Sequence, residues 1–499
     1  MNWKMIWKSL ADSDMRKRIL VVFGILLVFR VLAHIPIPLS DSETLRTVLD
    51  NLFNSQNTPQ FLSFVNVLSG GALANFSIML VGLGPYINAS IIMQLLTKAL
   101  PKLETMNKEG EYGRKKINQM TRILTFPLAI IQSVGTIFLV KQQASQISGL
   151  GDLTANATMA QWVLMVAALT GGAMMLMWLG ELITEQNIGN GISLLITVGI
   201  VASLPSAIIR LIGTVFGQGQ KWEIFGATLP VSRNGLIFTA ILSLVVLLVT
   251  MAVVRLNEAQ RRLTVHYAKR VQGNRTYGGV TTMLPVKLIT AGVIPIIFAV
   301  AFLSVPSFLG QILTTNNSLR LQEFGANLNV WFATPTAESL TSGAWQAYIY
   351  PIIYFLLVFL FTFFYTSIAF NAKDIAENLQ KQGGFIADVR SGKQTEKYLA
   401  RTVNRLTLFG AISLGLLAVV PIIAEAFYAS NLAITGTSIL ILVAVSLETL
   451  RQIDSRAMLI TYSQYDGSDF FQTVEKEEKK RRFVPKVPKL SRKTKKTKK

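Results

Sequence analysis

Long apolar runs alternate with polar connections along the chain. Nine runs of about 20 residues are long enough to cross a bilayer as helices, and a tenth, shorter run follows Gly189-Asn190-Gly191 directly. We therefore predict an all-α polytopic membrane protein with ten transmembrane helices. The predicted spans are 19–39, 78–97, 122–140, 160–183, 188–209, 235–254, 288–309, 346–370, 406–428 and 433–450.

Two glycine-rich places interrupt this pattern. Between Phe61 and Leu83 the chain carries Ser69-Gly70-Gly71 and then runs into Gly82-Leu83-Gly84-Pro85. Glycine and proline at this density break a helix, so we expect a discontinuous second helix: a half-helix, a break, and a span from about 78. The other place is Gly189–Gly191. Irregular backbone at membrane depth must be buried in protein or line a watery cavity.

Ten spans also divide into two groups of five, with residues 19–212 forming an N-terminal half and residues 213–454 a C-terminal half. Such a division is typical of two pseudo-symmetric halves with the pathway between them. Residues 1–18, where Trp and Lys recur four apart, predict an interfacial cytoplasmic segment. The first apolar run lacks a small-residue cleavage site, so we expect a retained anchor rather than a signal peptide.

The distribution of Lys and Arg predicts the orientation. The two ends of the chain and every second connection together carry 41 of them, whereas the alternate connections carry only five. Because basic residues concentrate on the cytoplasmic side, we expect both termini and the long loops 255–287 and 371–405 to be cytoplasmic. The tail, 455–499, has a net charge of +11 between Lys476 and Lys499, so it is expected to be solvated and to bind anionic lipids or RNA.

Composition agrees with a membrane protein and excludes several classes of function. Hydrophobic residues make up 51% of the 499 residues and charged residues 15%, against about 25% charged in soluble domains. The absence of cysteine excludes disulfides, zinc–thiolate sites and iron–sulfur clusters. There is no HExxH, phosphate-binding loop, nucleophile elbow or Ser–His pair. We therefore predict no enzyme, no catalytic or metal-binding residue and no cofactor.

Four apolar residues beside the two breaks are candidates for a constriction. Leu83 and Ile87 share one helix face, as do Ile192 and Ile196, because residues four apart lie on the same side of a helix. A ring of branched apolar side chains excludes water and therefore ions. The alternative is that these residues face lipid or neighbouring helices, and spacing alone favours that alternative.

The two long basic loops suggest a binding partner. Each exceeds 30 residues, which is longer than a simple connection requires, and Lys or Arg could contact phosphate groups or an acidic protein surface. The positive-inside distribution by itself needs no partner. Arg30 lies within a span, where we expect it to pair with a carbonyl or carboxylate group.

Three classes of function compete for this architecture. A channel for unfolded polypeptides needs only an apolar seal, with energy supplied by a partner. A secondary transporter of small solutes shares the ten spans and broken helices, but no paired carboxylates lie at a predicted midplane. An intramembrane protease would need a catalytic dyad, which the sequence lacks.

Several of these segments resemble the SecY family, the channel subunits of the bacterial Sec protein translocase. The similarity extends from about residue 15 to 467. It is carried by Ser69-Gly70-Gly71-Ala72-Leu73, the segment 84–96, Lys108–Ile117, Met177-Trp178-Leu179-Gly180-Glu181, Gly189-Asn190-Gly191-Ile192-Ser193, Tyr267-Ala268-Lys269-Arg270, Leu284-Pro285-Val286-Lys287, Ala291–Pro295, Gly383-Gly384-Phe385-Ile386 and Gly436-Thr437-Ser438.

The resemblance implies a protein-conducting channel of the plasma membrane with three working parts. Apolar segments of the substrate would leave sideways through a lateral gate between the second and third spans and the seventh and eighth. The implied pore ring is Leu83, Ile87, Ile192, Ile196, Ile297 and Ile441, of which the last two come from the resemblance alone. The implied plug is 64–76, including Ser69, Gly70, Gly71, Ala72, Leu73 and Asn75, and the gate residues are Asn88 and Arg122.

The resemblance also implies partners. SecE and SecG would complete a heterotrimeric channel, and the SecA ATPase or the ribosome would dock on the basic loops through Lys269, Arg270, Arg275 and Arg390. Unfolded secretory and membrane proteins would be the substrates. The sequence departs from the family at Asn75, where an Arg is common, and at Asn274, where a basic pair is reduced.

Overall fold

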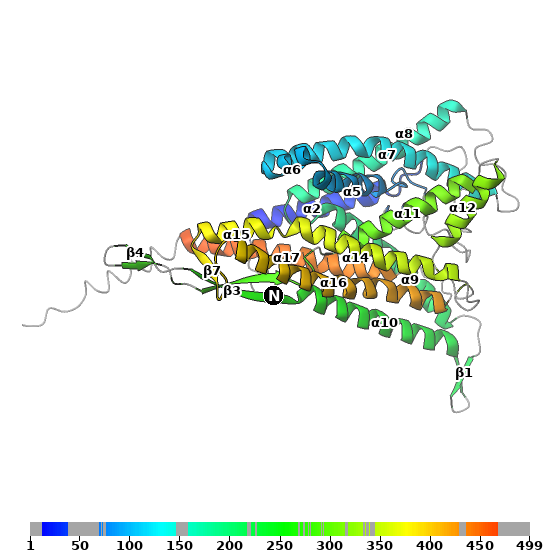
Figure 1. Ribbon diagram of the computed structural model, residues 1–499. Helices are drawn as coiled ribbons and strands as arrows, with labels where there is room; N and C mark the ends of the chain where they lie inside the picture. The colour runs from blue at the N-terminus through cyan, green and yellow to red at the C-terminus, as the bar shows by residue number, and fades with distance from the viewer. Residues whose placement is uncertain are drawn as a thin grey trace, which may run out of the picture.

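The computed structural model describes residues 12–37, 69–70, 72, 76–145, 158–216, 221–224, 227–267, 270–272, 275–277, 279, 281–290, 292, 294–314, 318–332, 335, 339, 345–428 and 436–467. Each of the ten predicted spans overlaps a long helix within this part of the chain (Figure 1). These helices are α2 (Ser13–Leu32), α5 (Gly84–Ala99), α7 (Glu111–Ser145), α8 (Met159–Glu185), α9 (Gly191–Phe216), α10 (Arg233–Glu258), α11 (Ile294–Thr314), α14 (Ile349–Ala369), α16 (Lys393–Tyr428) and α17 (Gly436–Gly467).

By length and composition alone, six helical stretches among the described residues could cross a membrane. Of the other predicted spans, α5 has only 16 residues, α2 begins with several charges, and α17 becomes polar after Glu448. In α9, the fifth span, the apolar stretch Gly191–Pro205 is shorter than these six. The six stretches are Glu111–Phe138, Met159–Glu185, Gly235–Glu258, Ile294–Thr314, Trp345–Lys381 and Lys393–Val420.

The second span starts later than predicted. Residues 78–83 are turns rather than helix, and α5 begins at Gly84, with Pro85 in its first turn. Gly82 has φ +65°, a conformation that ends helical backbone, and proline is well tolerated only at the start of a helix. The preceding turn is tied to the end of α2, because Ile78 N–H donates to the carbonyl of Ile35 at 3.0 Å.

The start of α9 at the second glycine break has a clear local cause. The Asn190 side chain accepts hydrogen bonds from the N–H groups of Ile192 (3.1 Å) and Ser193 (3.4 Å), which caps the helix. A Cβ at Gly191 would lie 1.8 Å from the carbonyl oxygen of Gly180 on α8. Only glycine therefore lets α8 and α9 approach this closely.

The two long basic loops contain strands and short helices that the apolar pattern did not predict. Strand β3 (Gln260–Tyr267) pairs with β6 (Thr281–Lys287) of its own loop and with β7 (Gly384–Ile386) of the other, all antiparallel. Leu263, Val265 and Ile386 pack with α15 (Ala372–Lys381) and the start of α16 in a small separate core. The two loops therefore form one structural unit. The remaining short elements are α6 (Pro101–Lys108), α12 (Leu319–Trp331), the 3₁₀ helix η1 (Trp345–Tyr348), β1 (Lys221–Ile224), β2 (Ala227–Ser232), β4 (Arg270–Gln272) and β5 (Arg275–Tyr277).

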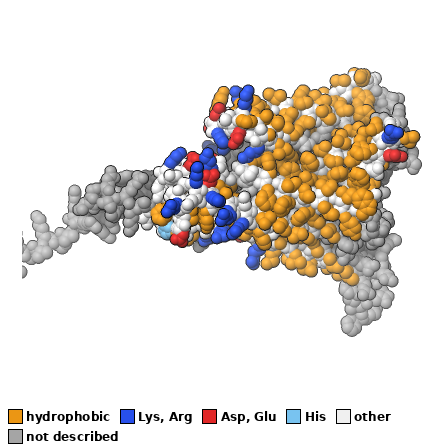
Figure 2. Space-filling view, viewed as in Figure 1, with side chains coloured by type: hydrophobic (Ala, Val, Ile, Leu, Met, Phe, Trp, Pro, Cys, Tyr) orange, Lys and Arg blue, Asp and Glu red, His pale blue; other side chains and the backbone are white. Residues whose placement is uncertain are grey.

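The surface divides into an apolar part and a charged end. Lys, Arg, Asp and Glu side chains gather where α6, α15, β3 and β7 lie, which we call the basic end (Figures 1 and 2). Most of the remaining described face is hydrophobic (Figure 2). Leu20, Ile123, Leu247 and Phe409, on four different helices, are exposed examples. Exposed side chains of this kind are expected where lipid rather than water surrounds the helices.

Candidate pore and lateral gate

Five of the six predicted ring residues are buried in the interior, and the sixth packs against the same apolar cluster. The five are no more than 6% exposed and belong to one buried apolar cluster, and Ile192 packs against that cluster as a half-buried residue. Burial shows that these five side chains do not face lipid, while packing against neighbouring helices, the other part of the alternative, agrees with their place in the cluster. Leu83 is the N-cap of α5 and Ile87 lies within it, and the others come from α9 (Ile192, Ile196), α11 (Ile297) and α17 (Ile441).

The described part of the predicted plug lies in the same interior. Ser69 and Ala72 are fully buried, and Ala72 belongs to the cluster that contains the buried ring residues. Gly71, Leu73 and Asn75 lie outside the described residues. The described residues of this segment therefore share the apolar core with the buried ring candidates.

Arg30 and Phe29 of α2 hold this segment at Gly70. The guanidinium Nη1 of Arg30 donates a hydrogen bond of 2.7 Å to the carbonyl oxygen of Gly70, which confirms the expectation that this embedded arginine pairs with a carbonyl. Gly70 has φ +71°, and a Cβ there would lie 2.5 Å from the Phe29 ring. Both the backbone conformation and the close contact therefore require glycine.

The helices expected to form the lateral gate are packed against each other. The seventh span, α11, contacts both α5 and α7 of the first half and α14 of its own half. Asn88 is a half-buried residue of α5. Arg122 of α7 forms a two-pronged ion pair with Glu181 of α8, with N–O distances of 2.8 and 2.7 Å. This pair joins two helices of the same half, so it positions α7 rather than crossing between halves.

The predicted docking residues lie in the unit made by the two basic loops. Arg270 and Arg275 belong to the antiparallel hairpin β4–β5, where Arg270 is opposite Tyr277. Arg390 is exposed in the turn that follows β7, and its carbonyl accepts a hydrogen bond of 2.9 Å from the Thr395 hydroxyl. Lys269 lies outside the described residues.

Sequence reasoning missed the contacts that join the first span, the tenth span and the turn between α8 and α9. Arg18 of α2 and Arg456 of α17 both donate to the carbonyl of Gln186, at 3.5 and 3.4 Å. Arg456 also lies 3.9 Å from the Asp14 carboxylate, which pairs with Arg18 at 3.0 Å. These residues are far apart in the chain, and no local pattern predicts their meeting.

At the basic end, α6 carries an exposed ion pair. Lys108 Nζ lies 2.8 Å from a carboxylate oxygen of Glu104. This hydrogen bond, together with the charge of Lys108, lowers the pKa of Glu104, and the same contact raises the pKa of Lys108. The pair stabilises α6 through neighbours four residues apart.

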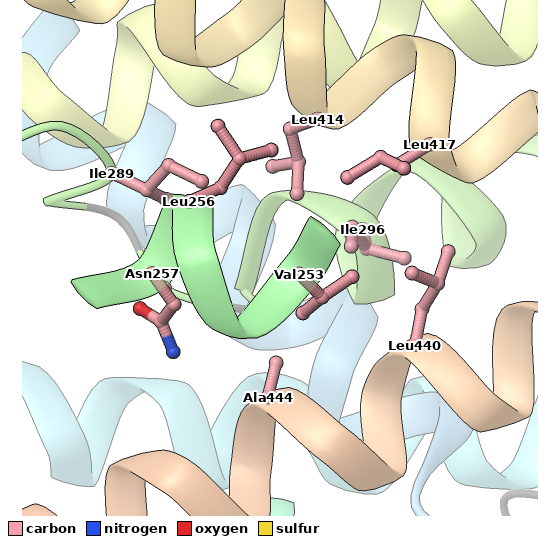
Figure 3. A pocket seen from close by; sticks show the side chains of 10 residues that line it. Val253, Leu256, Asn257, Ile289, Ile296, Leu414, Leu417, Leu440 and Ala444 are labelled. Atoms are coloured by element: carbon pink, nitrogen blue, oxygen red, sulfur yellow. The ribbon is translucent and has the colours of Figure 1, made fainter. Parts of the chain in front are cut away.

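The best-formed cavity among the described residues offers little to a small molecule. It lies between α10, α11, α16 and α17, has a volume of about 10 Å³ and is almost entirely apolar (Figure 3). That is the room of about one water molecule. In the described part of the chain, no group of three or more His, Asp or Glu residues is placed to hold a metal ion.

The fold and the buried core define a polytopic helical membrane protein whose interior contains apolar side chains from both halves. Comparison with known proteins agrees. A family model described as SecY matches residues 77–450. The protein translocase subunit SecY of Streptomyces galbus is 40% identical over 464 residues, covering 92% of this chain and 98% of that protein. SecY of Mycobacterium tuberculosis is 37% identical over 461 residues, with coverages of 92% and 98%.

Solved structures give the same fold. "The structure of a protein conducting channel" aligns with a TM-score of 0.56 at 16% identity, covering 87% of this chain and 90% of that one. Sec61 in a canine ribosome–channel complex aligns with a TM-score of 0.52 at 16% identity and the same coverages. These likenesses establish the fold alone.

The chain belongs to the SecY family. It is accordingly a multi-pass membrane protein and a protein-conducting channel of the Sec translocase. The comparisons give no support to the small-solute transporter.

Proposed function

We propose that the six clustered residues form the seal through which an unfolded polypeptide passes. The observation that carries this proposal is that side chains from four helices in both halves gather in one buried apolar cluster. Flexible apolar side chains can close around chains of varied size without binding any one sequence, and when closed they exclude water and ions.

The plug and the gate complete the mechanism we propose. In this proposal the plug, whose described residues Ser69 and Ala72 are buried, seals the ring in the closed state and moves aside for a substrate. The seam between α5 and α7 on one side and α11 and α14 on the other opens to release apolar segments into lipid. Asn88 and Arg122 belong to the helices that border this seam.

The basic end is the proposed docking surface for the partners that supply energy. Arg270, Arg275 and Arg390 belong to loops joined by the β3–β7 pairing, so one partner could contact both loops at once. We propose the SecA ATPase and the ribosome as these partners, and SecE and SecG as the other channel subunits. The canine structural neighbour, whose title describes a ribosome complex, supports the ribosome.

Orientation and location follow from the same charges. We propose that the basic end and both termini face the cytoplasm of a bacterial cell and that the protein lies in its plasma membrane, because Lys and Arg concentrate on the cytoplasmic side of membrane proteins. The basic tail, 455–499, would bind anionic lipid headgroups or ribosomal RNA there.

Crosslinking of a stalled precursor tests the seal. A photoreactive amino acid at Ile87 or Ile192 should crosslink to a secretory precursor arrested during passage. The same probe at Leu95, which is 41% exposed on the lipid-facing side of α5, is the matched control. Absence of precursor adducts at both ring positions, or equal yields at Leu95, would contradict the proposal.

A further inference from the structure

A close contact between α7 of the first half and α11 of the second lies at Gly135. A Cβ at this glycine would lie 1.9 Å from Cζ of Phe308 and 2.6 Å from its Cε2. The end of the Phe308 ring therefore occupies the space that any other residue at position 135 would need for its side chain. Gly135 is buried and Phe308 is half-buried.

This contact belongs to the seam between the halves and not to the packing within either half. One turn before Gly135, the Gln132 amide lies over Gly84 of α5, 2.8 Å from the position of a Cβ there. On another side of α7, the hydroxyl of Ser133 meets that of Thr170 on α8 at 3.3 Å. Of these α7 contacts, only the one between Gly135 and Phe308 reaches the second half.

Lipid gives this contact its energetic importance. Because lipid tails are as apolar as the side chains, helices in a bilayer associate through close van der Waals packing, and small residues such as glycine permit that approach. Separating α7 from α11 would move the Phe308 ring away from Gly135 and lose the van der Waals contacts between them. A substrate segment entering the seam would have to replace them with its own.

We propose that Phe308 seated on Gly135 is a latch that sets how apolar a polypeptide segment must be to pass between α7 and α11 into the bilayer. The proposal rests on the proposed function of this seam as the lateral gate. A ligand shifts an opening equilibrium only by its differential affinity for the open state. A tighter latch therefore demands a more apolar segment, and a weaker latch admits less apolar ones.

Three variants separate the latch from general damage to packing. Phe308→Ala removes the ring from the space beside Gly135, and Gly135→Leu places a competing side chain in that space. Both should favour separation of α7 from α11. Gly135→Phe combined with Phe308→Gly moves the aromatic ring to α7 and the glycine to α11. This double variant should restore the close contact between the two helices. Leu309→Ala is the matched control, because Leu309 follows Phe308 in α11 but is 49% exposed.

Two measurements read out the effect. Since the chain has no cysteine, spin labels at Ile131 of α7 and Val305 of α11, both exposed, are unique, and their separation reports the seam in vesicles. The second measurement is membrane insertion of reporter segments with graded leucine content. For the least apolar segments, each single variant should raise insertion by about threefold, the factor that corresponds to losing roughly five heavy-atom contacts of about 0.1–0.2 kcal/mol each.

For both single variants we expect a longer or more broadly distributed distance between the two spin labels. Reporter segments should also need less apolar character to insert. The exchanged pair and Leu309→Ala should match the unaltered protein. Unchanged distance and threshold in both single variants would overturn the proposal, as would an exchanged pair that shows the sum of the two single effects.

Failure of the latch can be told apart from failure of the proposed function. If the unaltered protein does not insert even the most apolar reporter, the proposed role of the seam is wrong, and the label distances still decide whether Phe308 holds the helices together. If the most apolar reporter inserts equally in all variants while the threshold stays constant, the gate works and the latch proposal is refuted.

Discussion

Replacing Arg30 by glutamine should free the plug segment from α2. The arginine donates a charge-assisted hydrogen bond of 2.7 Å to the Gly70 carbonyl, from a half-buried position on the first span. Glutamine is shorter and uncharged, so it cannot keep this bond at full strength. The segment that contains Ser69, Gly70 and Ala72 would then leave the interior more often.

The bond length and burial set the size of the effect. A hydrogen bond to a charged group contributes about 1.5–3 kcal/mol, and the partial exposure of Arg30 places the value near the lower limit, about 1.5 kcal/mol. Because every 1.4 kcal/mol or so is a factor of ten in an equilibrium constant, the displaced fraction should rise about tenfold.

Ion conductance of the purified channel in lipid vesicles measures that fraction. Arg30→Gln should increase the basal conductance by about the factor derived above. Gly70→Ala should act in the same direction, because alanine disfavours φ +71° and its Cβ would press on the Phe29 ring. Arg320→Gln, on an exposed face of α12, is the charge-matched control and should leave the conductance unchanged.

A conductance unchanged in both Arg30→Gln and Gly70→Ala would refute this reasoning, provided that both variants still translocate a precursor. Arg30 would then be a structural residue of α2 without influence on the closed state. Arg30→Lys refines the test, since lysine keeps the charge but has a shorter reach and lacks the planar fork of arginine. The basal conductance of Arg30→Lys should lie between that of the unaltered protein and that of Arg30→Gln.

Three further predictions concern the ring, the docking surface and α6. Ile196→Ser, at a fully buried ring position, should raise ion conductance, whereas Val201→Ser on the exposed side of α9 should not. Arg390→Glu should weaken binding of SecA or ribosomes in co-sedimentation, and normal binding with normal export would count against the docking role. The pKa of Glu104 is lowered by Lys108, so the pair's contribution to α6 is present above the unfolded pKa of Glu, about 4.3, and is lost as the pH falls through the lowered value. Lys108→Met should abolish this pH dependence in hydrogen exchange of α6, and an unaltered profile would contradict it.

The sequence predicted the spans because their cause is local. A run of about 20 apolar residues can satisfy its backbone in a bilayer only as a helix, and each such run overlaps a helix in the structure. The error at the second span has a local cause as well. Gly82 adopts a left-handed conformation and Pro85 sits in the first turn, so regular helix starts at Gly84.

The strands of the basic loops could also have been found from the sequence. Residues 260–267 alternate polar with apolar or β-branched side chains towards their end, as a half-buried strand does. What the pattern could not supply is the partner of β3, because β7 lies more than a hundred residues further along the chain.

Only the tertiary structure decided which of the many apolar residues face one another. Isoleucine looks the same in the sequence whether it contacts lipid or the interior, and the buried cluster that holds the proposed ring residues draws on helices spread over most of the chain. The contacts of Arg30 with Gly70 and of Phe308 with Gly135 likewise join distant segments. In a bilayer these choices depend on the shapes that let two helices approach closely, and such shapes exist only once the helices are packed together.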